Sequence, residues 1–521
     1  MSFLVLLCSS DLEICSITTH AIALLCEEGR LTENPEDLAR SNLTVMRNFP
    51  VYSELSLQQF RITGPVAFQK RLRRLLTRMS MPGPGILTAW EAVFTRWRTI
   101  SKHILSPGVA AAGRIDDRLH AEWRNYSGFL ASIAGCCIAD LPHQLRADDS
   151  TLAGLRWIDR LASDGDSMSL LERFMKQCLQ LLVCKLVSVR ENIREVLGTE
   201  LNPRLYPQLF RSLETEFNTL FDPGFKDTQS ESRMLFAEQA CSLLKTIVER
   251  LEDAQDMFLT VDLGALTLSL ARYLNTLKED YTTLRVKIRM SQLVELVARK
   301  KELVNLRQDI KVRNHLLQIL SGWMTSPSKI NYSINSRKDE LLRPQRDLDR
   351  ACLKALVNLL HRLPLQPPEA AHDNTDVVDA RSQMFCSYFT SFLLLLDSNQ
   401  FEGDRRREFL TVTLTKDDAS SFQDLAIQAL SNMLSANVDV GLKFSLEIGY
   451  HDDLQTRTAF MHVLTNILTQ GTEFGALGDS AIGEKYEKLI DVSQVHSSFL
   501  WEWEGMADGD RMETGVLVAC E

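Results

Sequence analysis

The fold is decided by a stretch of sequence in which a helical pattern can be followed residue by residue, Ile448-Gly-Tyr-His-Asp-Asp-Leu-Gln-Thr-Arg-Thr-Ala-Phe-Met-His-Val-Leu-Thr-Asn-Ile-Leu-Thr-Gln-Gly-Thr-Glu-Phe474. It predicts one helix. The carboxylate of Asp452 or Asp453 can accept the unpaired N–H groups of the first turn, and Gly471 is expected to end the helix. Between them apolar residues recur at helical spacing: Leu454, Met461, Leu464 and Leu468, with Phe460, Val463 and Ile467 beside them. This pattern is typical of a helix that turns one face to a core.

A second stretch, Ser188-Val-Arg-Glu-Asn-Ile-Arg-Glu-Val-Leu-Gly198, indicates how such helices assemble. Val-Arg, then an apolar residue and a closing Leu-Gly, is typical of the inner helix of a HEAT repeat. Similar runs recur at irregular spacing in residues 347–356, 422–430 and 454–464. No segment alternates with period two for long enough to form a sheet. The sequence therefore predicts an all-α fold, an irregular helical solenoid of the HEAT or armadillo type.

Composition and charge exclude several classes of protein. The chain has 521 residues, of which 45% are hydrophobic and 24% charged, and its formal net charge is -10. An acidic chain of this kind is not expected to have nucleic acid as its main partner, because phosphate binding needs a basic surface. No run of about 18 apolar residues is present, so no membrane span is expected. The eleven cysteines are scattered through apolar runs without Cys-x-x-Cys spacing, which favours reduced core thiols in a cytoplasmic protein.

Two segments carry an excess of basic residues. In Phe68 to Met79 a leucine face is surrounded by lysine and arginine, and between Arg285 and Arg313 nine basic residues stand against three acidic ones. A membrane surface or an acidic partner could bind either segment. The simpler interpretation is a solvated helix face whose apolar side lies in the core.

Several blocks in one order resemble the neurofibromin family of Ras GTPase-activating proteins, which includes the fungal inhibitory regulators of Ras. The resemblance spans about residues 88–490 and is densest in 346–474. Its blocks are the two tryptophans Trp90 and Trp97, the Trp-x-Asn-x-Ser-Gly-Phe-Leu run (Trp123, Asn125, Ser127, Gly128, Phe129 and Leu130), and residues 200–210, 346–367, 429–441 and 448–474.

The resemblance implies a catalytic arginine that this sequence does not contain. Proteins of the family insert an arginine finger beside the nucleotide phosphates, from a Phe-Arg-Gly-Asn loop followed by a Phe-Leu-Arg…Pro-Ala motif, and neither motif occurs here. The arginines nearest to the expected position of this loop are Arg457 and those at 405–407, and none of them lies in the finger motif. Arg457 is expected to make local salt bridges within its helix. The sequence also has no His-Glu-x-x-His or Gly-x-Ser-x-Gly motif. No catalytic, cofactor-binding or metal-binding residue is predicted.

Four parts are expected along the chain. They are a helical repeat segment truncated at its start (1–80), a helical solenoid (86–345), a helical segment that enters an incomplete Ras-GAP domain (346–490), and a tail outside the family (491–521). The helical pattern stops soon after Ile490, and Val492-Ser493 is what a translated splice donor commonly encodes. We therefore expect the tail to come from a retained intron or a misplaced gene end.

The function implied by the resemblance is that of a regulator rather than an enzyme. The complete protein would be a GTPase activator that binds a Ras-type small GTPase and lowers Ras signalling, with self-association and peripheral contact with membranes. This chain, which lacks the finger motif, would be inactive alone. The alternative is a helical-repeat scaffold for protein–protein interaction with no role in GTPase activation.

Overall fold

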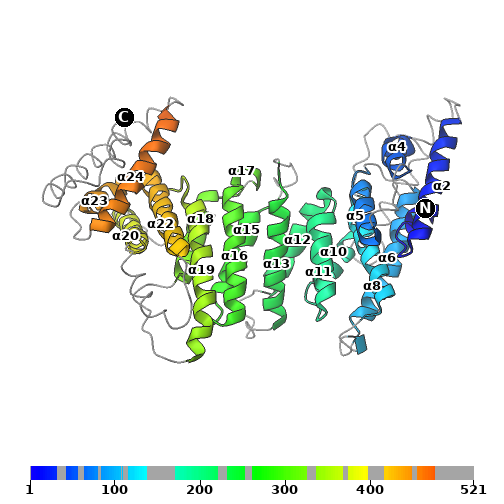
Figure 1. The fold of residues 1–521 in the computed structure, drawn as a ribbon, viewed down its shortest axis with the longest axis horizontal. Coiled ribbons are helices and arrows are strands. Elements are labelled where there is room, and N and C mark those ends of the chain that lie inside the picture. Colours follow the sequence, from blue (N-terminus) through cyan, green and yellow to red (C-terminus); the bar gives the residue numbers. More distant parts are fainter. Residues whose placement is uncertain are drawn as a thin grey trace. The chain divides into compact units, whose positions relative to one another are not determined.

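The structure is a computed structural model of the chain, and its described part is helical (Figure 1). It describes residues 2–31, 43–56, 64–79, 84–106, 108–109, 115–137, 170–220, 231–252, 261–304, 306–324, 336–367, 374–396, 416–448 and 454–475. These residues contain helices and turns and no strand, so the predicted all-α solenoid is confirmed. The tail 491–521, the cap residues Asp452 and Asp453, and arginines 405–407 lie outside the described residues.

The chain forms two compact units, one of Met1–Leu266 with Leu303–Asn305 and one of Thr267–Glu302 with Leu306–Glu521. Unit 1 contains α1 (Ser2–Leu6), α2 (Leu12–Leu31), α4 (Leu43–Ser56), α5 (Gly64–Leu76), α6 (Pro84–Ile104), α8 (Asp117–Ile133), η2 (Ala134–Cys137), α10 (Leu170–Leu181), α11 (Val187–Glu195), η4 (Val196–Glu200), η5 (Pro203–Leu205), α12 (Tyr206–Leu220) and α13 (Glu231–Glu249). The unit boundary falls inside α15 (Leu263–Asn275). The four parts expected from the sequence remain a prediction.

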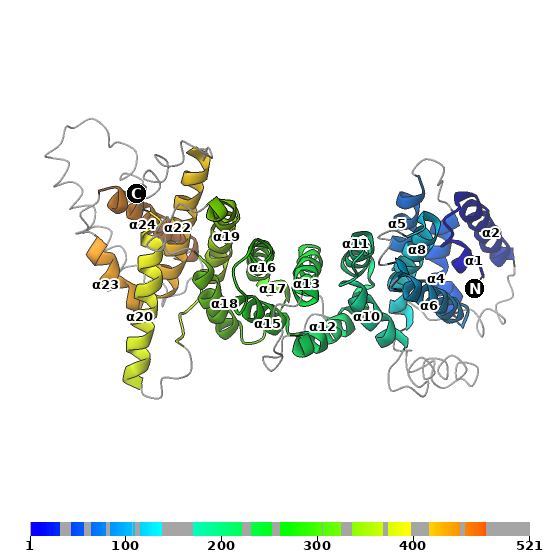
Figure 2. The ribbon, with the colours of Figure 1, turned by 90° about the horizontal axis from the view of Figure 1, so that it is seen from below.

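Unit 2 contains α16 (Tyr281–Arg299), α18 (Asp309–Trp323), α19 (Ser336–Leu360), α20 (Asn374–Leu393), α22 (Lys416–Ala436), α23 (Val438–Ile448) and α24 (Leu454–Gly475), while the short α17 (Lys301–Val304) crosses the unit boundary. Within each unit consecutive helices stack in two layers, as in a solenoid. Figure 2 shows α11 and α13 in one layer of unit 1 and α10 and α12 in the other. In unit 2, α19 packs against both α16 and α18.

Aromatic side chains form the core at the start of unit 1. Trp90 and Trp97 on α6 have their ring centroids 6.1 and 5.2 Å from that of Phe174 on α10, and all three side chains are buried. Burying each such ring stabilises the fold by roughly 1.5–3 kcal/mol. In unit 2 the corresponding cluster joins Phe385, Phe389, Phe444 and Phe460 from α20, α23 and α24.

Residues 448–474 were predicted to form one helix capped at Asp452 or Asp453, and the residues from Leu454 onward do form a single helix, α24. Ile448 ends α23, and α24 begins at Leu454 and continues through Gly471 to Gly475, so the predicted end at Gly471 is wrong. A glycine inside a helix costs only about 1 kcal/mol, which helix packing can offset. The buried face is formed by Phe460, Val463, Leu464 and Ile467, whereas Leu454 is exposed.

The cysteines of the described residues are free thiols, and most of them are buried. Burial raises the pKa of Cys136 and of Cys352 to about 12, because the thiolate would lose its hydration. These thiols are therefore core residues without the lowered pKa of a reactive cysteine.

Candidate functional site

Arg457, one of the arginines nearest to the missing finger motif in the sequence, is buried on α24 with 7% of its surface exposed. No group of three His, Cys, Asp or Glu side chains in the described ranges could hold a metal ion. None of the described helices is long and apolar enough to cross a membrane. The features that distinguish this chain are instead two buried polar clusters, one in each unit.

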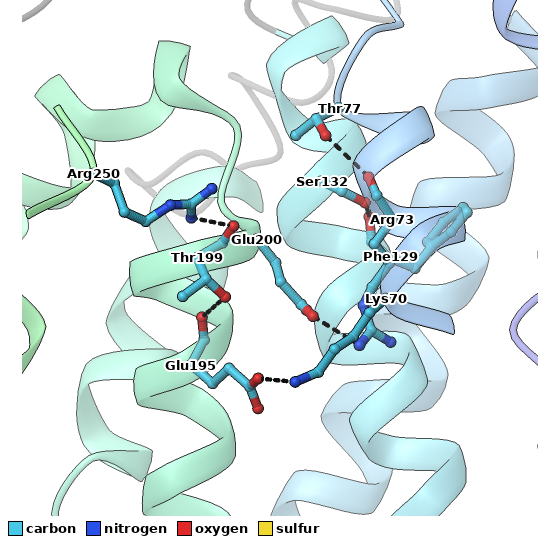
Figure 3. Close-up of polar contacts among 9 residues, drawn as sticks. All are labelled: Lys70, Arg73, Thr77, Phe129, Ser132, Glu195, Thr199, Glu200 and Arg250. Atoms are coloured by element: carbon cyan, nitrogen blue, oxygen red, sulfur yellow. Dashed lines mark hydrogen bonds and ion pairs between the residues drawn. The ribbon is translucent and has the colours of Figure 1, made fainter. Parts of the chain in front are cut away.

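The cluster in unit 1, the Arg73–Glu200 cluster, consists of Arg73, Gly128, Glu200 and Asn202. Figure 3 shows Arg73 and Glu200 with the polar contacts around them. Nη2 of Arg73 on α5 lies 2.7 Å from Oε1 of Glu200, and the two side chains are only 4% and 9% exposed. Separating the charges of a buried pair leaves one charge without compensation, which costs several kcal/mol. The pair therefore fixes α5 to the end of η4.

Gly128 on α8 makes room for this ion pair. A Cβ atom at position 128 would lie 2.1 Å from Cδ of Arg73 and 2.6 Å from Oε2 of Glu200, far inside van der Waals contact. The ion pair therefore passes directly over the backbone of α8. Gly128 belongs to the Trp-x-Asn-x-Ser-Gly-Phe-Leu run, and this contact gives a physical reason for glycine there.

Asn202 completes the same cluster by hydrogen bonds to backbone carbonyl groups. Its Nδ2 donates to the carbonyl oxygens of Thr77, at 3.1 Å, and Ser132, at 3.4 Å, and its backbone N–H donates to that of Ala131. A Cβ atom on Gly135 would lie 2.1 Å from Cγ of Asn202, so this glycine too accommodates a side chain. Asn202 thereby joins the ends of α5 and α8 to η5.

The turn that presents Glu200 is a π-helical turn, η4, at the end of α11. Nη1 of Arg250 donates to the carbonyl oxygens of Gly198 and Thr199, which satisfies acceptors that the helix end leaves open. On the solvent side Lys70 pairs with Glu195, but these side chains are 45% and 42% exposed. The outer pair is therefore worth far less than the buried one.

The remaining residues of the Trp-x-Asn-x-Ser-Gly-Phe-Leu run are also structural. The indole N–H of Trp123 donates to Ser101, that of Trp97 donates to Ser127, and that of Trp90 donates to the carbonyl of Leu130. Nδ2 of Asn125 donates to the carbonyl oxygens of Cys8 and Ser9 in the turn between α1 and α2. These hydrogen bonds join α8 to α6 and to the turn between α1 and α2.

The cluster in unit 2, the asparagine bracket, holds the extended segment 363–366 between two asparagines. Asn437 accepts from the N–H of Leu365 at 2.8 Å and donates to the carbonyl of Leu363 at 3.0 Å. On the other side Asn314 of α18 donates to the carbonyl of Pro364 at 3.1 Å and accepts from the N–H of Gln366 at 3.2 Å. Alternate residues of an extended chain point their backbone groups to opposite sides, so one asparagine can pair with each side.

Two arginines strengthen the bracket. Nη1 of Arg313 donates to the carbonyl oxygens of Leu359 and His361, both at 2.9 Å, and its other nitrogens pair with Asp309. Arg381 of α20 donates to Asn437 and forms two hydrogen bonds with Asp439. The segment that follows α19 is therefore tied to α18, α20 and the end of α22.

Replacing Asn437 by alanine tests the bracket. Asn437 is fully buried, and its loss leaves the N–H of Leu365 and the carbonyl of Leu363 unpaired. We expect the variant to lose about 3 kcal/mol of stability, since each buried unpaired group costs roughly 1–3 kcal/mol. Hydrogen exchange of the peptide that covers 357–367 should accelerate.

The control is Asn358→Ala, which removes one exposed hydrogen bond to the carbonyl oxygen of Lys354. It should change stability by less than about 0.5 kcal/mol. Equal effects of the two changes would contradict the bracket.

Sequence reasoning found the residues of these clusters only in part. It placed Gly128 in a run, and Glu200, Asn202 and Asn437 in the blocks 200–210 and 429–441, without indicating their contacts. It assigned the basic residues of 68–79 to a solvated surface. The apolar side of that segment, Phe68, Leu72, Leu75 and Leu76, does lie in the core of unit 1. Arg73, however, is buried on the same side. A glycine in a helix beside aromatic residues was the one available sign of a close approach.

The relatives of this chain among known proteins include two inhibitory regulators, and no family model matches the chain. Inhibitory regulator protein IRA2 of Saccharomyces cerevisiae is 24% identical over 496 residues, which are 92% of this chain and 15% of the relative. Inhibitory regulator protein IRA1 of the same yeast is 25% identical over 465 residues, which are 81% of this chain and 14% of the relative. The chain thus spans a small part of the length of these curated relatives. The resemblance inferred from the sequence blocks is confirmed: over most of its length this chain is similar to the inhibitory regulators of yeast.

Proposed function

We propose that this chain is part of a negative regulator of a Ras-type small GTPase, of the GTPase-activating type. The observation that carries the proposal is the similarity to two inhibitory regulators along 92% and 81% of the chain. Scattered structural blocks alone would support the fold and not the function. Similarity along nearly the whole chain supports descent from a regulator of this kind.

The role proposed for the chain is mechanical. A GTPase-activating protein contributes about 10³ to 10⁵ in rate by placing an arginine and steadying a water molecule, so the helices behind its catalytic region must be rigid. The asparagine bracket is suited to that purpose, because both ends of the Asn437 amide are hydrogen-bonded and a satisfied buried polar cluster favours one arrangement. We place the complete protein in the cytoplasm, with self-association and contact with Ras-bearing membranes as further parts of the proposal.

Two measurements test this function. Deleting the gene should raise the GTP-bound fraction of Ras in the cell, and an unchanged fraction would remove the proposal.

The 521-residue chain alone should leave the rate of GTP hydrolysis by purified Ras unchanged, since its sequence contains no Phe-Arg-Gly-Asn loop. Stimulation by the chain would show that another arginine acts as the finger.

The alternative function, a scaffold that binds other proteins, is favoured by a different observation. Helix α2 exposes a row of large apolar side chains, with Ile17 64%, Leu24 48% and Leu25 52% exposed, while Cys15 and Ile22 on its other side are buried. Such a surface is typical of protein contact. If the gene deletion leaves Ras unaffected while the chain still co-purifies with a defined protein through this row, the scaffold is the better description.

A further inference from the structure

The exposed apolar side chains of α2 have the spacing of a helix that pairs with another helix. Ile14, Ile17, Ala21 and Leu24 follow one another at intervals of three, four and three residues, and Leu25 lies beside Leu24. Ala21 is half-buried, whereas the other four are exposed, Ile14 to 39% and Ile17 to 64%. Intervals of three and four residues alternate along the apolar seam of a coiled coil. We call these five residues the α2 row.

A different face of α2 provides its contact with the rest of unit 1. Cys15, Thr18, Thr19 and Ile22 are buried, and the helix packs against α1 and α4. Figure 2 shows α2 outermost among the labelled helices of unit 1. A helix that is apolar on two faces is typical of one that is buried on both of them. In the described part of unit 1 the α2 row is nevertheless exposed.

The charges around the α2 row are all negative. Residues 2–29 contain four carboxylates and neither lysine nor arginine. Glu13 stands four residues before Ile17, and Glu27 stands three residues after Leu24, so one exposed carboxylate borders the row at each end. Neither Glu13 nor Glu27 forms an ion pair with another described residue, and two lysine and arginine side chains of the neighbouring segment pair elsewhere, Lys70 with Glu195 and Arg78 with Glu54.

The position of these carboxylates indicates the chemistry of a partner. Glu13 and Glu27 are two seven-residue repeats apart, so they occupy equivalent places beside the row. In paired helices, side chains at such places meet those of the facing helix, and opposite charges there select the partner. We propose that the α2 row is a docking surface for an amphipathic helix of a partner protein, one with the same apolar spacing and with basic residues beside its apolar face.

Two other occupants fit the charges less well. A second copy of the chain, docked by its own α2 row, would bring no lysine or arginine to Glu13 or Glu27, since residues 2–29 contain none. An anionic membrane is repelled by the same carboxylates, and helices that lie on membranes usually have lysine or arginine beside their apolar face. The net charge of -10 acts in the same direction, because it attracts a basic helix and repels both of the others.

The test uses the full 521-residue chain and two fluorescein-labelled helical peptides of about three heptads, which share one apolar seam. The lysine peptide has lysine beside the seam, and the glutamate peptide has glutamate there. Fluorescence anisotropy should show tighter binding of the lysine peptide, and the difference should shrink as salt is raised. Glu13→Lys with Glu27→Lys should reverse the preference, because attraction and repulsion exchange places.

A second pair of changes tests the apolar contact. Ile17→Gln with Leu24→Gln should weaken binding of the lysine peptide about ten-fold or more, since two apolar contacts are lost without any change of charge. The matched control is Val66→Gln with Val187→Gln, at exposed apolar positions on α5 and α11 of the same unit. The control should bind as the parent does. Glutamine is a good helix former, so circular dichroism should show parental helix content in both pairs.

Four results would overturn the proposal. They are equal binding of the two peptides by the parent chain, an equal loss of binding in the control pair, a dimer in sedimentation that Ile17→Gln with Leu24→Gln dissociates while neither peptide binds, and binding to phosphatidylcholine vesicles that needs the row while neither peptide binds. Docking at the row deepens the alternative function and does not depend on the role in Ras regulation, since the assay contains no GTPase. If the peptides fail but a protein still co-purifies through the row, the alternative function stands and the chemistry proposed for its partner is wrong.

Discussion

Replacing Gly128 by valine is expected to unfold unit 1 or to lower its stability by about 4 kcal/mol or more, a loss that marks a clash or an unpaired buried charge. The new Cβ would lie 2.1 Å from Cδ of Arg73, 2.4 Å from its Nε and 2.6 Å from Oε2 of Glu200. No flexible end can move aside, because the Arg73 side chain is held at its far end by Glu200. Both the packing of α8 and the buried ion pair would be lost together.

The measurement combines urea unfolding, followed by helical circular dichroism, with hydrogen exchange of peptides from α5, α8 and η4. Exchange should accelerate in these peptides first. Gly322→Ala on α18 is the control, since no heavy atom lies within 4 Å of a Cβ built there. This control should leave stability unchanged or raise it by roughly 0.5–1 kcal/mol, because alanine restricts the unfolded chain. A Gly128→Val protein that unfolds at the same urea concentration as the parent would refute the assignment.

Replacing Arg73 by methionine is expected to cost about 3–5 kcal/mol, because the carboxylate of Glu200 would stay buried without its cation. The comparable change at the surface, Lys70→Met, removes the exposed pair with Glu195 and should cost less than about 1 kcal/mol. Urea unfolding of both variants measures the contrast. Similar losses for the two variants would show that the Arg73–Glu200 pair is not buried as described.

A double variant separates the burial of charge from the loss of packing. Nε and Nη1 of Arg73 and Oε2 of Glu200 have no hydrogen-bond partner among the described residues, so the pair is incompletely compensated. Replacing both members by apolar residues, Arg73→Met with Glu200→Leu, should therefore recover most of the stability lost in Arg73→Met alone. A double variant less stable than the single one would indicate that the ion pair contributes net stability.

Helical spacing in the sequence was enough to predict the fold class and many of the helices. Phe460, Val463 and Ile467 face the core of unit 2, as the apolar pattern of residues 454–468 indicated, because side chains three and four residues apart share one face of a helix. The end of α24 was misplaced, since a glycine at position 471 lowers helix propensity but does not forbid a helix that is held by packing.

The sequence by itself determined that this chain is helical, which residues could lie in a core, and that its blocks resemble those of a known family. Only the tertiary structure decided the partners of the polar residues. Arg73 meets Glu200 across 127 residues of chain, and Asn437 binds the backbone of Leu365 across 72. A helical pattern relates residues three or four apart, so it cannot distinguish an arginine that pairs with a distant carboxylate from one that faces water. That distinction depends on which helices stack against each other, and so the buried clusters appear only once the helices are placed in space.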